Sequence, residues 1–241
     1  MTRSAAGFAV LLVVWGNVVS AVLGTSAWLP GGSWSFVLAG LALIAVSVAA
    51  ARWLGLDGKA AGLSGDPLRG ALIGLAIGAV AAAIGVGALR TVAPAIVGRA
   101  IEYEPLSTAH GPELARHVAF FLPLGDIFPE EIAFRGVLLG ALVGAVGARR
   151  AILASAAAFA LWHVAVIIVT LGDTTLGPPS PWFPVAVVGA LVAVFAGGVV
   201  FAWLRLRTRS LATTVVMHWA FNVVVLLGLW STRSSVPSGC C

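Results

Sequence analysis

Three short polar segments interrupt an otherwise apolar sequence and carry the residue types of a hydrolytic site. They are Glu130-Glu131-Ile-Ala-Phe-Arg135, Phe159-Ala-Leu-Trp-His163 and His218-Trp-Ala-Phe-Asn222. Ionisable groups are costly at membrane depth, and they are retained mainly where they face a cavity and serve a function. Two carboxylates, an arginine, two histidines and an asparagine in separate apolar runs therefore predict an active site inside a membrane protein.

The spacing within the first segment separates the roles of its two glutamates. Glu131 and Arg135 are four residues apart, so a helix places them on one face in the order that favours an ion pair. Glu130 and Glu131 are neighbours, which puts them about 100° apart around a helix. We therefore expect Glu131 to hold Arg135 and Glu130 to act on a substrate or on water. The alternative is one buried salt-bridge network of all three residues.

The other two segments supply groups for proton transfer and for binding negative charge. A carboxylate beside an imidazole can take a proton from water and later return it to a leaving amine. We expect Glu130 and His163 to form this pair. Imidazole N–H and amide groups can donate hydrogen bonds to an oxyanion. His218 and Asn222, four residues apart on one helix face, are the expected donors. Each pair could instead be a hydrogen-bonded contact between packed helices.

A metal site is the other chemistry that these residue types allow. One glutamate and two histidines could bind zinc. The sequence contains no His-Glu-x-x-His segment, however, and the amide of Asn222 is a poor zinc ligand. We expect that no cofactor is required, with zinc as the alternative.

The elements that position these residues follow from the composition. The chain has 241 residues, of which 60% are hydrophobic and 10% charged, and its mean hydropathy is +1.06. A soluble domain carries about 25% charged residues, so lipid must surround much of this exterior. Seven apolar runs are compatible with the ~20 residues needed to cross a bilayer. They cover residues 5–29, 34–54, 70–89, 118–143, 151–171, 183–204 and 211–229.

These runs predict an all-α, polytopic transmembrane helix bundle with about seven spans. We expect a single integral membrane domain over residues 1–241, with a catalytic core over 115–225. At 1.5 Å per residue the polar groups fall at compatible depths, from about 10 Å for His218 to about 20 Å for Glu130. Glycines repeat every fourth residue in two runs, which predicts close helix packing. They are Gly70, Gly74 and Gly78, and Gly136, Gly140 and Gly144.

Basic residues fall mainly in the turns between the runs, and their density alternates along the chain. The positive-inside rule places the N-terminus in the cytoplasm and the C-terminus outside a multi-pass protein of the cell membrane. Because the basic residues form no single patch, we expect the lipid bilayer and no nucleic acid as a partner. The first run, which follows Arg3, could alternatively be a cleaved signal peptide. Cys240 and Cys241 provide no disulfide framework.

In this order, the three segments resemble the CPBP family, the CAAX-processing and bacteriocin-processing intramembrane endopeptidases, also called the Abi family. The family pattern of Glu-Glu-x-x-x-Arg, Phe-x-x-x-His and His-x-x-x-Asn is matched at every position. The resemblance implies a helical membrane fold with a cytosol-accessible cavity. It implies that Glu130 and His163 activate water and that His218 and Asn222 stabilise the oxyanion. It also implies that the family's metalloprotease label does not require a real metal.

An intramembrane endopeptidase of the CAAX-processing or bacteriocin-processing type is therefore the main functional prediction. Its catalytic residues are predicted to be Glu130, Glu131, Arg135, His163, His218 and Asn222. Its substrate would be a peptide or protein, either prenylated or a bacteriocin precursor. The first alternative is a non-catalytic membrane immunity or peptide-binding protein that uses the same cavity. The second is a small transporter or proton path, which the absence of a recognisable internal repeat disfavours.

Overall fold

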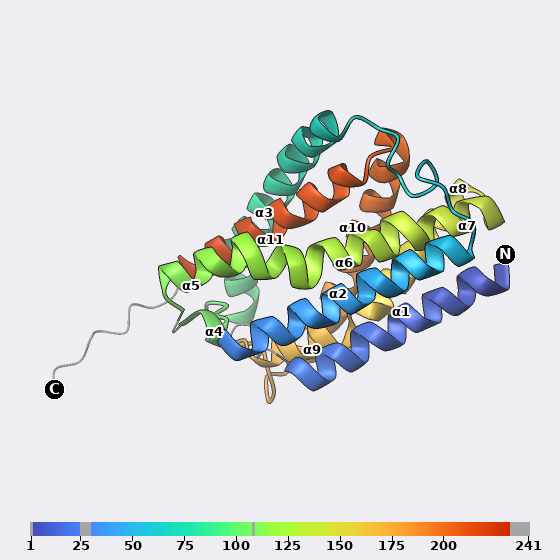
Figure 1. Cartoon of the computed structure of the whole chain (residues 1–241). Helices are drawn as coiled ribbons and strands as arrows, with labels where there is room; N and C mark the ends of the chain where they lie inside the picture. The colour runs from blue at the N-terminus through green and yellow to red at the C-terminus, as the bar shows by residue number, and fades with distance from the viewer. Residues whose placement is uncertain (1, 25–29, 108, 232–241) are drawn as a thin grey trace.

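The structure is a computed structural model that describes residues 2–24, 30–107 and 109–231 (Figure 1). Cys240 and Cys241 lie outside the described residues. Within the described part the named elements are all helical, which confirms the predicted fold class. Five helices are long and apolar enough to cross a membrane. They are α1 (Thr2–Leu23), α2 (Pro30–Trp53), α3 (Pro67–Val97), α10 (Phe183–Thr208) and α11 (Leu211–Trp230).

A sixth candidate span is a broken helix. The predicted run 151–171 forms α8 (Ala148–Trp162) and α9 (Val164–Gly172), which are bent by 42° relative to each other. His163 stands alone at the break, with φ −87° and ψ 1°. The sequence predicted an uninterrupted helix here, and this detail was wrong. At this break the backbone bonds to a side chain from another helix.

The remaining predicted run, 118–143, lies in a composite helix of short α and π segments. Its segments are α5 (Gly111–Arg116), η2 (His117–Phe121), η3 (Pro123–Ile127), α6 (Phe128–Glu131), η4 (Ile132–Leu138) and α7 (Leu139–Val146). Proline has no N–H to donate, and π adjustments restore backbone bonding around such residues in membrane helices. The N–H of Phe128, for example, reaches back five residues to the Pro123 carbonyl. Pro129 thus lies inside a continuing helical run.

The helices run between two ends of the bundle. α1 begins at one end and α11 ends at the other, and we call these the N-terminal end and the C-terminal end (Figure 1). The loops before α3 and before α11 lie at the N-terminal end, where Leu63 and Ser210 form an isolated β-bridge. The loops after α3 and after α9 lie at the C-terminal end, where Tyr103 and Thr174 form another.

Small residues let the helices approach closely, as the glycine spacing predicted. Gly70, Gly74 and Gly78 of α3 are buried against α11, and a Cβ atom at Gly74 would lie 2.9 Å from the backbone nitrogen of Met217. The second glycine series differs in its partner. A Cβ atom at Gly140 would lie 2.7 Å from the carbonyl oxygen of Ala60, so this residue packs against the α2–α3 loop rather than another helix.

Candidate active site

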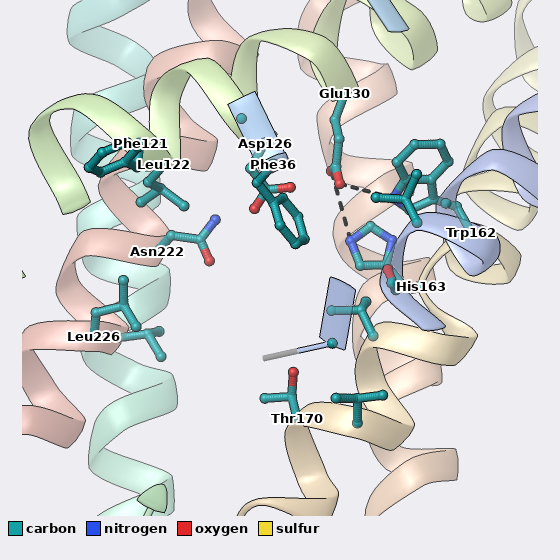
Figure 2. A pocket seen from close by; sticks show the side chains of 18 of the residues that line it. Phe36, Phe121, Leu122, Asp126, Glu130, Trp162, His163, Thr170, Asn222 and Leu226 are labelled. Carbon is teal, nitrogen blue, oxygen red and sulfur yellow. Dashed lines mark hydrogen bonds and ion pairs between the residues drawn. The ribbon is translucent and has the colours of Figure 1, made fainter. Parts of the chain in front are cut away.

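The predicted residues meet at a cavity inside the bundle. The cavity has a volume of about 430 Å³ and is bounded by α1, α2, α9, α11 and the composite helix. Glu130, His163, His218 and Asn222 all line it. Figure 2 shows Glu130 and His163 on one side of the cavity and Asn222 across from them. Three distant stretches of the sequence therefore place their polar groups around one hollow, as their matching depths indicated.

Glu130 presents one free carboxylate oxygen to this cavity. The residue is only 4% exposed. Its Oε1 accepts a hydrogen bond of 2.9 Å from the indole Nε1 of Trp162. Its Oε2 lies 3.8 Å from Nε2 of His163 and accepts no hydrogen bond from the described residues (Figure 2). The indole thus fixes the carboxyl group and leaves its second oxygen available for chemistry.

The tautomer of His163 is set by the backbone. Its Nδ1 lies 2.8 Å from the carbonyl oxygen of Phe159, and this acceptor requires a proton on Nδ1. In the neutral ring, Nε2 then carries a lone pair that faces Oε2 of Glu130. Two acceptors 3.8 Å apart are suited to a water molecule that donates one hydrogen to each. This arrangement is the one that a water-activating pair needs.

Asn17 of α1 holds the helix break that aims His163, and the sequence analysis did not identify it. Its Oδ1 accepts from the N–H of Ala165 at 2.9 Å, and its Nδ2 donates to the carbonyl of Leu161 at 2.8 Å. These are backbone groups on the two sides of the break. In lipid, freed backbone groups need such internal partners. The available signal was a lone amide within an apolar run, a residue type that often bonds between membrane helices.

Gly16 of α1 makes room for the indole ring of Trp162. A Cβ atom at Gly16 would lie 2.5 Å from Cε3 and 2.7 Å from Cε2 of the Trp162 indole. Only a residue without a side chain leaves room for the ring in this position. α1 therefore positions both members of the water-activating pair, Glu130 through the indole and His163 through the helix break.

Glu131 and Arg135 form the expected ion pair behind the cavity wall. Arg135 Nη1 lies 3.0 Å from Glu131 Oε1, and the two side chains are 1% and 0% exposed. The guanidinium carbon also lies 3.9 Å from the ring centroid of Phe159 and 4.8 Å from that of Phe201. Aromatic faces stabilise a desolvated cation by about 2 kcal/mol. The spacing of Glu131 and Arg135 within one helix turn thus gives a local ion pair, and two other helices supply the aromatic rings.

Glu131 has a second partner that its spacing could not predict. Nδ1 of His218 lies 3.0 Å from the same Oε1 atom. Because Glu131 is ionised in its pair with Arg135, Nδ1 of His218 must be the donor. A neutral His218 then has only a lone pair at Nε2. To donate a hydrogen bond to an oxyanion from Nε2, His218 must be the imidazolium ion, with part of its charge balanced by Glu131.

Asp126 is a third carboxyl group at the cavity, and the sequence analysis did not include it. It lines the same wall as Glu130, four residues earlier in the composite helix, and Figure 2 shows it between Glu130 and Asn222. The two residues are four positions apart, so their carboxyl groups lie on the same face of the composite helix. Two neighbouring carboxyl groups can share a hydrogen bond only when one of them holds a proton. The available signal was an acidic residue one turn before the glutamate pair.

The arrangement of the donor groups bears on the zinc alternative. Among the residues that the structure describes, no three His, Cys, Asp or Glu side chains are grouped so that they could hold a metal ion. The Nδ1 bonds of His163 and His218 leave Nε2 of each ring free, and histidines that bind zinc usually make such a bond through their other nitrogen. The independence from metal therefore stays a prediction.

Comparison with known proteins gave one match. Residues 113–224 match the family model described as type II CAAX prenyl endopeptidase Rce1-like. The matched stretch contains all six predicted site residues, together with Asp126 and Trp162. Neither the search of curated proteins nor the search of solved structures found a significant match.

Proposed function

Because the chain belongs to the Rce1-like type II CAAX prenyl endopeptidases of the CPBP family, we propose that its Glu130 and His163 activate water to hydrolyse a peptide bond at membrane depth. Membership makes the chain a protease, and its long apolar helices make it a multi-pass membrane protein. The observation that carries the proposal is the pair of facing acceptors, Glu130 Oε2 and His163 Nε2, at the cavity.

In the proposed reaction, a water molecule donates one hydrogen to Glu130 Oε2 and one to His163 Nε2. One of these acceptors takes a proton as the water oxygen attacks the carbonyl carbon of the peptide. The tetrahedral intermediate then collapses, the C–N bond breaks, and the same group returns the proton to the departing amine. Such general acid–base catalysis contributes about 10²- to 10⁴-fold to a rate.

The developing oxyanion needs donors on the opposite side of the cavity. We assign these to Asn222, whose amide faces the cavity, and to the imidazolium form of His218. Glu131 supports this form because its oxygen accepts from Nδ1 of the ring. Removal of one such donor typically costs about 10²- to 10³-fold in kcat.

The remaining walls of the cavity are mostly apolar, and they support a membrane-associated substrate. Phe36, Phe121, Leu122 and Leu226 line it beside the polar groups (Figure 2). We propose that the apolar part of a peptide, such as a prenylated or bacteriocin-precursor segment, lies against them. No metal ion is needed in this mechanism. Dialysis against a chelator should leave turnover unchanged, and restoration of lost turnover by added zinc would contradict this part of the proposal.

Turnover of a peptide by the purified protein tests the catalytic assignment. Glu130→Gln and His163→Ala should each lower kcat by at least about 10²-fold. Both variants should elute as folded protein, because Gln can still accept from the Trp162 indole and the shortened side chain at position 163, where His163 is 16% exposed, only enlarges the cavity. Glu104→Gln, on the exposed α4 segment (Glu104–Ser107), is the matched control and should keep full activity. Unchanged turnover in Glu130→Gln would overturn the assignment.

The same variant separates hydrolysis from simple peptide binding in a living cell. If the protein protects cells against a peptide toxin by hydrolysing it, Glu130→Gln should abolish the protection. Protection that persists in this variant would favour a peptide-binding role for the cavity.

A further inference from the structure

The cavity extends from the polar cluster toward only one end of the bundle. Most of the described residues that line it belong to the C-terminal parts of α1, α3, α9 and α11, to the N-terminal part of α2 and to the N-terminal half of the composite helix. All of these parts lie on the side of the C-terminal end. The other lining residues are His218 in the first half of α11, Trp162 and His163 at the helix break, and residues of two loops. Glu130, His163 and His218 are among the lining residues farthest from the C-terminal end. The extent of the lining therefore indicates access from the C-terminal end.

The loops at the C-terminal end take part in the cavity wall. Ile101 and Tyr103 line it from the loop after α3, and Thr174 and Leu176 from the loop after α9. The Tyr103 and Thr174 bridge, which consists of two backbone hydrogen bonds of 2.9 and 3.1 Å, connects these loops. The cavity thus reaches the surface loops of one membrane face, and it has no described wall residue from the loops of the other.

The two ends differ strongly in basic residues. Of the Lys and Arg residues in the described part of the chain, nine lie at the N-terminal end: Arg3, Arg52, Lys59, Arg69, Arg149, Arg150, Arg205, Arg207 and Arg209. Three lie at the C-terminal end: Arg90, Arg99 and Arg116. The connecting loops at both ends are short, which is the condition under which basic residues determine orientation. The bias predicts that the N-terminal end faces the cytoplasm.

We propose that the catalytic cavity opens to the extracytoplasmic face of the membrane, and that the enzyme acts on exported peptides or on extracytoplasmic segments of membrane proteins. The side of access rests on the charge distribution and on the direction of the cavity. The statement about substrates rests also on the proposed hydrolytic function. The family resemblance implied a cytosol-accessible cavity. A cytoplasmic N-terminus and a cytosolic opening cannot both hold here, because they lie at opposite ends of this bundle.

Labelling of single cysteines with a membrane-impermeant thiol reagent tests the orientation without any activity. In a background with Cys240→Ser and Cys241→Ser, Ala100→Cys places an exposed thiol at the C-terminal end and Ser64→Cys one at the N-terminal end. In sealed spheroplasts we expect at least tenfold faster labelling of Ala100→Cys than of Ser64→Cys. Inverted vesicles should reverse the order. The opposite order, or equal labelling of both sites in spheroplasts, would overturn the proposal.

A third variant tests the cavity itself. Thr170 lines the cavity below the catalytic groups, as Figure 2 shows, and Thr170→Cys should react from outside the spheroplasts, although more slowly than Ala100→Cys. Reaction only in inverted vesicles, or in neither preparation while the detergent-solubilised protein reacts, would contradict access from outside. These outcomes do not depend on turnover. If labelling follows the expectation but Glu130→Gln keeps full activity, the hydrolytic assignment fails and the orientation stands.

Discussion

Asn17 offers the sharpest test of how the bundle aims its site. Replacement by leucine keeps the size of the side chain and suits the lipid environment, but it removes the amide that satisfies Leu161 and Ala165. The backbone on both sides of the break would lose its partners. We expect α8 and α9 to straighten toward a regular helix, which would rotate the imidazole of His163 away from Glu130.

The size of the effect follows from the lost hydrogen bonds. A buried backbone group left without a partner costs about 1–3 kcal/mol in soluble proteins. Hydrogen bonds between membrane helices average only about 0.6 kcal/mol, because the unfolded chain in the membrane also finds partners. If the break straightens, Ala165 can bond to Leu161 within the helix and the loss is about 1 kcal/mol. If the break persists, two unpaired groups cost about 2–6 kcal/mol. At about 2–4 °C per kcal/mol for a chain of this size, Tm should fall by roughly 2–24 °C.

The effect on turnover should exceed the effect on substrate binding. Asn17 bonds to the helix break and makes no wall of the cavity, so KM should change little. A displacement of about 1 Å at a reacting group can cost about 10²-fold in rate, and we expect a kcat loss of that order for Asn17→Leu. The measurements are peptide turnover and thermal unfolding in one detergent, with Val18→Leu as the lipid-facing control on the same helix. Unchanged kcat and Tm in Asn17→Leu would refute the positioning role.

Three further variants probe other parts of the site. Gly16→Ala should displace the indole that it contacts and lower kcat about tenfold or more, whereas Gly7→Ala, with open space around its Cβ position, should behave as wild type in the same assay. Glu131→Gln should lower the free energy of unfolding by about 3–5 kcal/mol, because it leaves a buried arginine unpaired. In the double variant with Arg135→Met, thermal unfolding should recover much of this loss, but turnover should not recover. Asp126→Asn should lower kcat about 10²-fold and change the pH profile of kcat/KM, since an amide cannot share a proton with the water-activating carboxylate. An unaltered pH profile would exclude Asp126 from the proton path.

The sequence alone determined that lipid surrounds much of this protein, and which side chains share a face within each helix. Apolar runs of about 20 residues can satisfy their backbone in lipid only as helices, so composition specified the fold class. Glu131 and Arg135 meet because residues four apart share one helix face, whatever the rest of the fold does. The order of the three polar segments was also sufficient to indicate the family that residues 113–224 match.

Only the tertiary structure decided how these segments act on one another. The break at His163 has no proline or glycine beside it, and the side chain that bonds to the backbone on both sides of it is Asn17, more than 140 residues earlier in the chain. The bond from His218 to Glu131 likewise joins groups 87 residues apart, and it changes which form of the imidazole can donate to an oxyanion. The face toward which the cavity opens depends on which helix ends meet at its walls. Helical periodicity carries information over a few residues only, so contacts between helices and the direction of the space between them appear only once the bundle has packed.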